Sequence, residues 1–188
     1  MGPPNERLAA EAKEAGRTHL PLKVGIGLNT GDAVVGNMGT AQRMDYSVLG
    51  DTVNTASRLE GQSKAYGVDI VIGPQTAAAV PEMAVLEIDL LQVKGKTVGL
   101  QVFTLKGDET MAQDPAFKAL KVVHDEMLKA YRSQRWEKAK ELLKECHAKG
   151  DEAFHLADFY ELYDGRVKAY EADPPGPDWN GVFIATSK

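Results

Sequence analysis

The sequence has little cysteine, no long apolar run and no excess of basic residues. Of its 188 residues only Cys146 is a cysteine, so the chain cannot form an internal disulfide, and nothing indicates an oxidising compartment. The longest run without a charged residue is 70–81, which holds 12 residues and two prolines, whereas a membrane helix needs about 20 apolar residues. We therefore expect no membrane contact by this segment. The N-terminus lacks a basic stretch followed by an apolar one, which predicts no secretory signal. The single cysteine favours a reducing, cytoplasmic location, and a membrane anchor upstream in the full-length protein is the alternative.

The charge balance is mildly acidic. Lys and Arg number 22 against 27 Asp and Glu, which gives a net charge of −5. Proteins that bind nucleic acid strongly carry a net basic face, so nucleic acid is not the expected partner. With 43% apolar residues the chain can bury an ordinary core.

The composition changes near Lys106-Gly107-Asp108, which predicts two units. Residues 1–107 hold most of the glycines and read as an α/β part, and residues 108–188 read as helical. The elements predicted in the first unit are helices over 5–17, 52–66 and 74–79 and strands over 22–28, 33–35, 44–49, 69–72, 85–91 and 100–105. Asp51 is the expected N-cap of the second helix, and Met38-Gly39-Thr40 is an expected turn. Gly25 and Gly27 leave one strand face bare, so another backbone or a ligand can approach it closely.

The helical unit carries three apolar stripes at helical spacing. They are Phe117, Leu120, Val123, Met127 and Tyr131; Trp136, Ala139, Leu143 and Cys146; and Leu156, Tyr160, Tyr163, Val167 and Tyr170. The 34 residues 117–150 match the tetratricopeptide period, but an independent solenoid needs three or more copies. We expect a TPR-like helical appendage packed on the α/β part, with 179–184 holding down the tail. No spacing among the histidines and Cys146 fits a zinc site, so we expect solvated histidines and a buried cysteine.

The most informative stretch is 43–60, where a strand ends in Gly50-Asp51 and a helix begins. Asn54 and Arg58 lie one turn apart on that helix. An arginine beside an amide donor can direct its planar guanidinium at a phosphate. The alternative is that both side chains are solvated or pair with nearby carboxylates, and their spacing alone does not exclude it.

Residues 24–105 resemble the C-terminal half of the class III adenylate/guanylate cyclase catalytic domain. The shared elements are Gly25-Ile26-Gly27 through Gly31, Val35-Gly36-Asn37-Met38-Gly39, the run 45–54, Ala56-Ser57-Arg58-Leu59 and Val93-Lys94-Gly95-Lys96. The tail also resembles tails that follow bacterial cyclase domains. The resemblance implies an α+β fold, in which a partial ferredoxin-like domain with a mixed or antiparallel sheet precedes a helical hairpin.

The resemblance also implies roles for four residues. Asn54 matches the asparagine that orients the ribose, and Arg58 matches the arginine that stabilises charge on the α-phosphate. Lys94 matches the lysine that binds the β- and γ-phosphates; the alternative is a surface lysine in a tight hairpin. Ser47 stands where the family reads the purine, and its hydroxyl can accept a hydrogen bond from the adenine amino group, which favours ATP.

The chain departs from the family at the metal site. Class III cyclases hold two metal ions, Mg²⁺ or Mn²⁺, with two aspartates on strands that precede the region seen here. Asp32, Asp45 and Asp51 do not match those positions, so no metal ligand is assigned to this chain. We therefore expect a piece of a longer cyclase, which is inactive alone. The resemblance places the active sites in a head-to-tail homodimer, in which one protomer supplies the aspartates and the other supplies Ser47, Asn54, Arg58 and Lys94.

Several functions follow as hypotheses. The first is an adenylate cyclase that converts ATP to 3′,5′-cyclic AMP and pyrophosphate in signal transduction. A guanylate cyclase differs only in the choice of base. A third reading is a non-catalytic nucleotide-binding or dimerisation module whose helical tail binds a protein partner. A fourth is a peptide-binding hairpin, which requires Tyr131, Trp136 and Tyr160 to line one open apolar groove.

Overall fold

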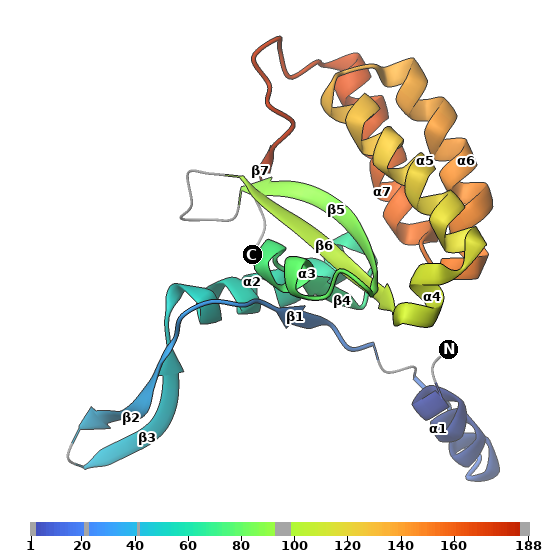
Figure 1. Ribbon diagram of the computed structural model, residues 1–188. Coiled ribbons are helices and arrows are strands. Elements are labelled where there is room, and N and C mark those ends of the chain that lie inside the picture. Colours follow the sequence, from blue (N-terminus) through green and yellow to red (C-terminus); the bar gives the residue numbers. More distant parts are fainter. Residues whose placement is uncertain (1–2, 21–22, 41, 93–98, 185–188) are drawn as a thin grey trace.

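The structure is a computed structural model that describes residues 3–20, 23–40, 42–92 and 99–184. The helices are α1 (Pro3–Glu14), α2 (Asp51–Tyr66), α3 (Pro74–Ala79), α4 (Glu109–Gln113), α5 (Pro115–Arg132), α6 (Trp136–Phe154) and α7 (Ala157–Ala172). The strands are β1 (Ile26–Leu28), β2 (Val34–Thr40), β3 (Arg43–Leu49), β4 (Ile70–Ile72), β5 (Ala84–Gln92), β6 (Leu100–Gly107) and β7 (Phe183–Ile184). Figure 1 shows these elements along the chain.

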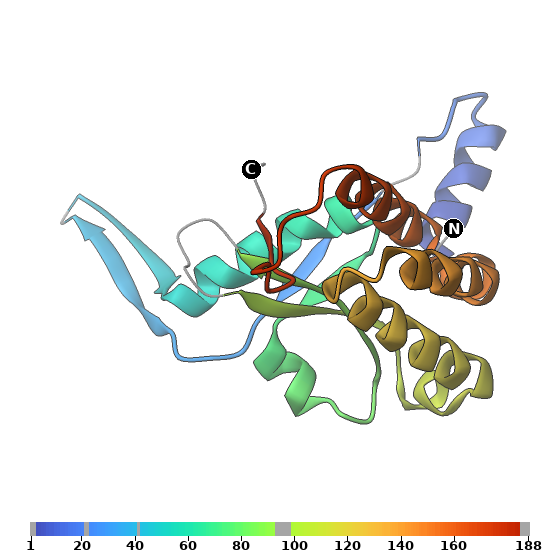
Figure 2. The same cartoon turned by 90° about the horizontal axis from the view of Figure 1, so that it is seen from above.

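The strands form a five-stranded sheet and a separate two-stranded hairpin. The order in the larger sheet is β1-β4-β6-β5-β7. Its outer pairs, β1 with β4 and β5 with β7, are parallel, and its inner pairs are antiparallel. The hairpin of β2 and β3 projects away from the body of the molecule in both views (Figures 1 and 2). The expected α+β class with a mixed sheet is therefore confirmed.

The helical tail and the sheet share one hydrophobic core. α2 packs against β1 and β4, α5 packs against β5, and α7 reaches α2. Fully buried residues from each part meet in this core, among them Leu59, Leu86, Leu120, Tyr131 and Tyr163. Figure 2 shows the three long helices lying together beside the sheet. The prediction that the tail packs on the α/β part is confirmed, and the third stripe forms a helix of its own next to the predicted hairpin.

The last described residues hold the tail against the sheet, as predicted. β7 pairs with the end of β5, where Leu91 lies opposite Phe183. Trp179 packs with Tyr131, Trp136 and Tyr170 in an aromatic cluster. Within the described residues, no helix is long and apolar enough to span a bilayer.

Several predicted boundaries are wrong. β1 covers only three residues, whereas a strand over 22–28 was predicted, and residues 21–22 lie outside the described part. The predicted turn at Met38-Gly39-Thr40 is strand, because β2 pairs with β3 as far as Thr40 opposite Arg43. The N-cap of α2 is Gly50 and not Asp51, since the chain turns there with φ 152° and ψ 159°, a conformation that favours glycine.

Candidate functional site

Helix α2 rests directly on β1 because two glycines leave room for it. A Cβ atom on Gly27 would collide with the backbone oxygen of Ala56 and the backbone nitrogen of Glu60. A Cβ atom on Gly25 would collide with the Ser63 hydroxyl. The predicted close approach to these glycines is thus confirmed, and the approaching group is the backbone of α2.

The start of α2 is fixed by the loop that follows β1. The Asn29 side-chain amide donates a 3.2 Å hydrogen bond to the carbonyl oxygen of Thr52. The hydroxyls of Thr30 and Thr76 lie 2.9 Å apart and tie the same loop to α3. These contacts hold the first turn of α2, which bears Asn54, in a defined place relative to the sheet.

Asn54 and Arg58 lie one turn apart on one flank of α2. The adjacent flank, about 100° round the helix, carries the buried residues Thr55, Leu59, Ser63 and Tyr66. Asn54 is exposed and Arg58 is half-buried. Within the described residues, neither side chain makes a hydrogen bond or an ion pair, so pairing with a nearby carboxylate is not observed. The guanidinium and the amide remain accessible to a ligand.

Ser47 lies on β3, the strand that runs through Gly50 into α2. It is exposed, and its neighbour across the hairpin is Gly36. A Cβ atom added to Gly36 would meet no atom within 4 Å, so the surface beside the Ser47 hydroxyl is open. Lys94 falls outside the described residues, between the end of β5 at Gln92 and the start of β6 at Leu100. The structure therefore brings Asn54 and Arg58 together, with Ser47 on the strand that leads to them.

The described residues do not offer a donor set for a pair of metal ions. No group of three or more His, Cys, Asp or Glu side chains within the described ranges could hold a metal. Asp45 lies on the hairpin, 3.8 Å from the guanidinium of Arg43, and Asp51 is engaged in an interaction.

The expectation of solvated histidines is wrong for His124. This residue is fully buried, and its Nε2 lies 2.6 Å from the carbonyl oxygen of Glu87. Because a carbonyl only accepts, Nε2 carries the proton, and Nδ1 accepts from the Tyr160 hydroxyl at 3.0 Å. Burial lowers the pKa of His124 and keeps the ring neutral. The sequence did contain a signal, since His124 lies four residues after Leu120 and three before Met127 on the apolar stripe.

Cys146 is buried, as expected. Burial raises the pKa of its thiol to about 12, which disfavours the reactive thiolate.

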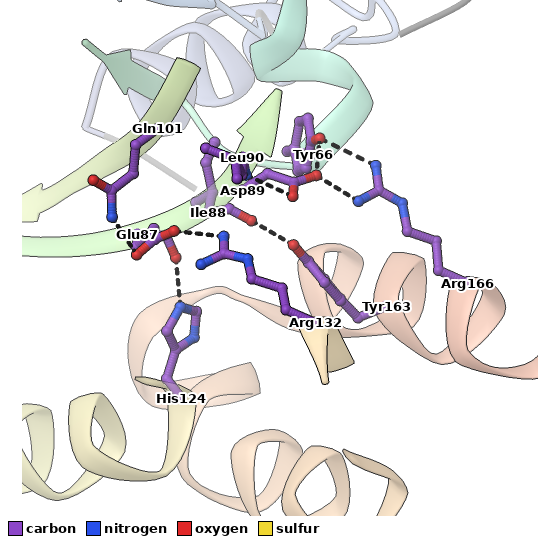
Figure 3. A network of polar contacts seen from close by, with 10 residues as sticks. All are labelled: Tyr66, Glu87, Ile88, Asp89, Leu90, Gln101, His124, Arg132, Tyr163 and Arg166. Carbon is purple, nitrogen blue, oxygen red and sulfur yellow. Dashed lines mark hydrogen bonds and ion pairs between the residues drawn. The ribbon is translucent and has the colours of Figure 1, made fainter. Parts of the chain in front are cut away.

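A buried polar network that was not predicted from the sequence joins the tail to the sheet (Figure 3). Arg166 Nη1 on α7 lies 2.6 Å from Asp89 Oδ2 on β5, and Arg166 Nη2 donates to the Tyr66 hydroxyl at 3.1 Å. The Tyr66 hydroxyl in turn donates to Asp89 Oδ2 at 2.5 Å. One signal was available, because Asp89 interrupts the apolar strand 85–91 and Arg166 stands beside Val167 on an apolar stripe.

The peptide-groove hypothesis is not supported by the three aromatic residues on which it depended. Tyr131 and Tyr160 are fully buried. Trp136 is partly buried and packs against Tyr131, Tyr170 and Trp179. These side chains fill the core and do not line an open groove.

Comparisons with known proteins point to the same family as the sequence motifs. The family described as "Adenylate and Guanylate cyclase catalytic domain" matches residues 7–107. Adenylate cyclase 1 of Rhizobium meliloti (strain 1021) is 35% identical over 104 residues, which cover 54% of this chain and 16% of that protein. The adenylate cyclase of Anabaena cylindrica is 38% identical over 98 residues, which cover 50% of this chain and 20% of that protein. The chain thus spans a fifth or less of the length of these curated relatives.

Among solved structures, the chain is similar to the adenylyl cyclase CyaB from P. aeruginosa. The TM-score is 0.45 at 30% sequence identity, and the match covers 53% of this chain and 50% of that one. The family match covers more than half of the residues and contains Ser47, Asn54, Arg58 and Lys94. The chain therefore belongs to the adenylate and guanylate cyclase catalytic domain family.

Proposed function

We propose that this chain forms part of an adenylate cyclase, which converts ATP to 3′,5′-cyclic AMP and pyrophosphate. Residues 1–107 are the C-terminal portion of the catalytic domain, and residues 108–188 are its helical tail. The observation that carries the proposal is that Asn54 and Arg58 lie on one accessible flank of α2, one turn apart and without a partner among the described residues. Two side chains arranged in this way can both contact a bound substrate.

The two side chains suit the reaction. The 3′-oxygen of the ribose attacks the α-phosphorus and pyrophosphate leaves, so negative charge builds up on the α-phosphate. The guanidinium of Arg58 stabilises that charge through hydrogen bonds in a fixed orientation. The amide of Asn54 binds the ribose and holds its 3′-oxygen in line with the phosphorus. Lys94 binds the β- and γ-phosphates of the leaving group.

The purine base of the nucleotide is recognised on the β2–β3 hairpin. The Ser47 hydroxyl accepts from the adenine amino group, and the absence of a side chain at Gly36 leaves space for a planar ring beside it. Guanine has a carbonyl oxygen at the position of that amino group, so a guanylate cyclase would need a donor there. A hydroxyl can also donate, so GTP is the alternative substrate.

The active site needs a second protomer. Val35, Val48, Tyr46 and Met44 share one face of the β2–β3 hairpin, and all four are exposed. An exposed apolar strip of this kind is typical of a protein interface, and it supports a homodimer through the cyclase domain. The metal-binding aspartates and the two Mg²⁺ or Mn²⁺ ions come from the partner protomer, from a segment outside residues 1–188. Residues 1–188 alone are then inactive.

The proposal is tested by replacing Asn54 or Arg58 with alanine in the complete protein. We expect kcat for cyclic AMP formation to fall by about 10²–10³-fold, with KM for ATP within about threefold, because these groups act mainly in the transition state. Lys64→Ala is the matched control, since it removes a cation from an exposed position on the same helix. It should leave both parameters unchanged.

The outcomes separate the candidate functions. Equal losses in kcat and in ATP affinity would show that Asn54 and Arg58 only bind substrate. Cyclic GMP as the main product would assign a guanylate cyclase. Nucleotide binding by the complete protein without any turnover would favour the non-catalytic module; its supporting observation is that the described residues form no cluster of three or more metal-ligating side chains.

A further inference from the structure

Both ends of helix α2 are held in place, each by contacts with a different part of the molecule. Its first turns bear Asn54 and Arg58. Its last turn bears Tyr66, which is 1% exposed and enters the polar network between the tail and the sheet (Figure 3). Whatever fixes Tyr66 therefore restrains the helix that carries the proposed site.

The network around Tyr66 joins the buried ion pair of Asp89 and Arg166 to the neutral Tyr66 hydroxyl. Both oxygens of Asp89 are bonded, Oδ1 to the backbone nitrogen of Leu90 at 2.7 Å and Oδ2 to Tyr66 and Arg166. Asp89 has no exposed surface, and the Arg166 side chain is 9% exposed. Burying a carboxylate is costly unless a cation and hydrogen-bond donors surround it, so the buried Asp89 depends on Arg166.

Aromatic rings fix the guanidinium of Arg166 in place. Its Cζ atom lies 3.5 Å from the centre of the Phe183 ring on β7, and about 5 Å from those of Tyr66 and Tyr163 (5.2 and 5.3 Å). The C-terminal strand thus covers the arginine and shields it from water. A planar guanidinium stacked in this way has one orientation, in which it reaches both Asp89 and Tyr66.

The tail also binds the backbone of the strand on which this network stands. Ile88 is the extra residue of a bulge, because Glu87 lies opposite Phe103 and Asp89 opposite Val102. The Tyr163 hydroxyl donates to the Ile88 carbonyl oxygen at 2.7 Å, and His124 donates to that of Glu87. Side chains from α5 and α7 therefore contact three successive residues of β5.

From these contacts we propose that Arg166 is a positioning residue for the cyclase reaction. Through Asp89 and the Tyr66 hydroxyl it fixes the C-terminal end of α2, and with it the placement of Asn54 and Arg58. The tail then supports catalysis by fixing the position of α2, and it is not an independent binding module. This inference rests on the proposed function, because it assigns the tail a role at that same site.

The test compares two tyrosines of the same network. Tyr66→Phe removes the hydroxyl that links α2 to Arg166 and Asp89, and Tyr163→Phe removes a hydroxyl that links α7 to β5 and does not touch α2. Each variant loses one buried hydroxyl and keeps its ring. In the complete protein we expect Tyr66→Phe to lower kcat about five- to tenfold with KM for ATP within about twofold, and Tyr163→Phe to leave kcat within about twofold.

Amide hydrogen exchange provides a second readout that does not depend on activity. We expect faster exchange across α2 in Tyr66→Phe than in Tyr163→Phe. Equal exchange of α2 in the two variants, or an equal loss of kcat, would overturn the positioning role. An unmodified protein that makes no cyclic nucleotide would contradict the proposed function instead, and the exchange measurement would then decide whether Tyr66 couples the tail to α2.

Discussion

Arg166 and Asp89 are 77 residues apart in the chain and form a buried ion pair with a separation of 2.6 Å. The arginine comes from α7, the last helix of the tail, and the aspartate comes from β5, which lies between β6 and β7 in the sheet. The pair therefore joins the tail to the cyclase-like part at a point where water is excluded. Loss of this buried pair should therefore lower the stability of the protein more than loss of a surface ion pair.

Replacing Arg166 with methionine should destabilise the protein strongly. The Asp89 charge would stay buried without its cation, which costs about 3–5 kcal/mol in comparable cases. Urea unfolding followed by circular dichroism measures the change. The exposed pair of Lys138 and Glu141 is the control, and Lys138→Met should have little effect. Adding Asp89→Asn to Arg166→Met should recover part of the loss, and a single-variant loss below about 1 kcal/mol would contradict a charged pair.

Gly27→Ala tests the contact between β1 and α2. The new methyl group would press on the backbone of Ala56 and Glu60, so α2 must shift, at a cost of about 1–3 kcal/mol. Gly36→Ala is the matched control, since its methyl group would enter open space, and its effect should stay within about 1 kcal/mol. Thermal unfolding of both variants gives the comparison. Equal stabilities of the two variants would show that α2 does not rest on Gly27.

His147 should make stability depend on pH. Burial lowers its pKa, but hydrogen bonds to the Asp151 and Asp164 carboxylates, at 2.6 and 3.1 Å, outweigh this and raise the pKa above 6.5. A raised pKa means that the stabilisation is complete below about pH 6.5 and is lost as the pH rises through the folded-state value.

The variant for this prediction is His147→Gln, which cannot become charged. The stability difference between the unmodified protein and the variant should be largest near pH 6 and should shrink at higher pH. Urea unfolding at pH 6, 7, 8 and 9 measures it. The neutral, buried His124 is present in both proteins, so its own loss of stability at acid pH cancels in the difference. A difference that does not change with pH would argue against a charged His147.

Ser47→Ala should reduce the preference for ATP over GTP. Loss of one hydrogen bond of about 1 kcal/mol predicts that the ratio of kcat/KM for ATP to that for GTP falls about three- to tenfold. Cyclic AMP and cyclic GMP formation by the complete protein give the two values. Thr40→Ala removes another exposed hydroxyl from the same hairpin and should leave the ratio unchanged. An unchanged ratio in Ser47→Ala would place base recognition elsewhere.

The sequence predicted those parts of the fold that depend on local patterns. Helical periodicity located the stripe from Phe117 to Tyr131, and all five of its residues are buried. The bare strand face at Gly25 and Gly27 correctly indicated a close approach. The spacing of Asn54 and Arg58 correctly placed them one turn apart on α2, while their role was inferred from the family resemblance.

What the sequence did not reveal depends on contacts between distant segments. The apolar neighbours of Asp89 and of Arg166 are a signal that each charge is buried, but nothing local showed that these two residues, 77 positions apart, pair with each other. The length of the β2–β3 hairpin was underestimated because Gly39 and Thr40 are typical of turns, whereas cross-strand pairing keeps them in the ladder. His124 was misjudged because its residue type outweighed its position on an apolar stripe.

Mixing a complete protein of low activity with the chain of residues 1–188 tests the central claim most directly. The first is the complete protein with Arg58→Ala, which retains the proposed metal-binding segment. The second is the chain of residues 1–188, which retains Asn54 and Arg58. If the active site is shared between protomers, cyclic AMP formation in the mixture should rise well above that of either component, and it should not rise when the second chain also carries Arg58→Ala. A mixture that makes no more cyclic AMP than its separate components would contradict the account.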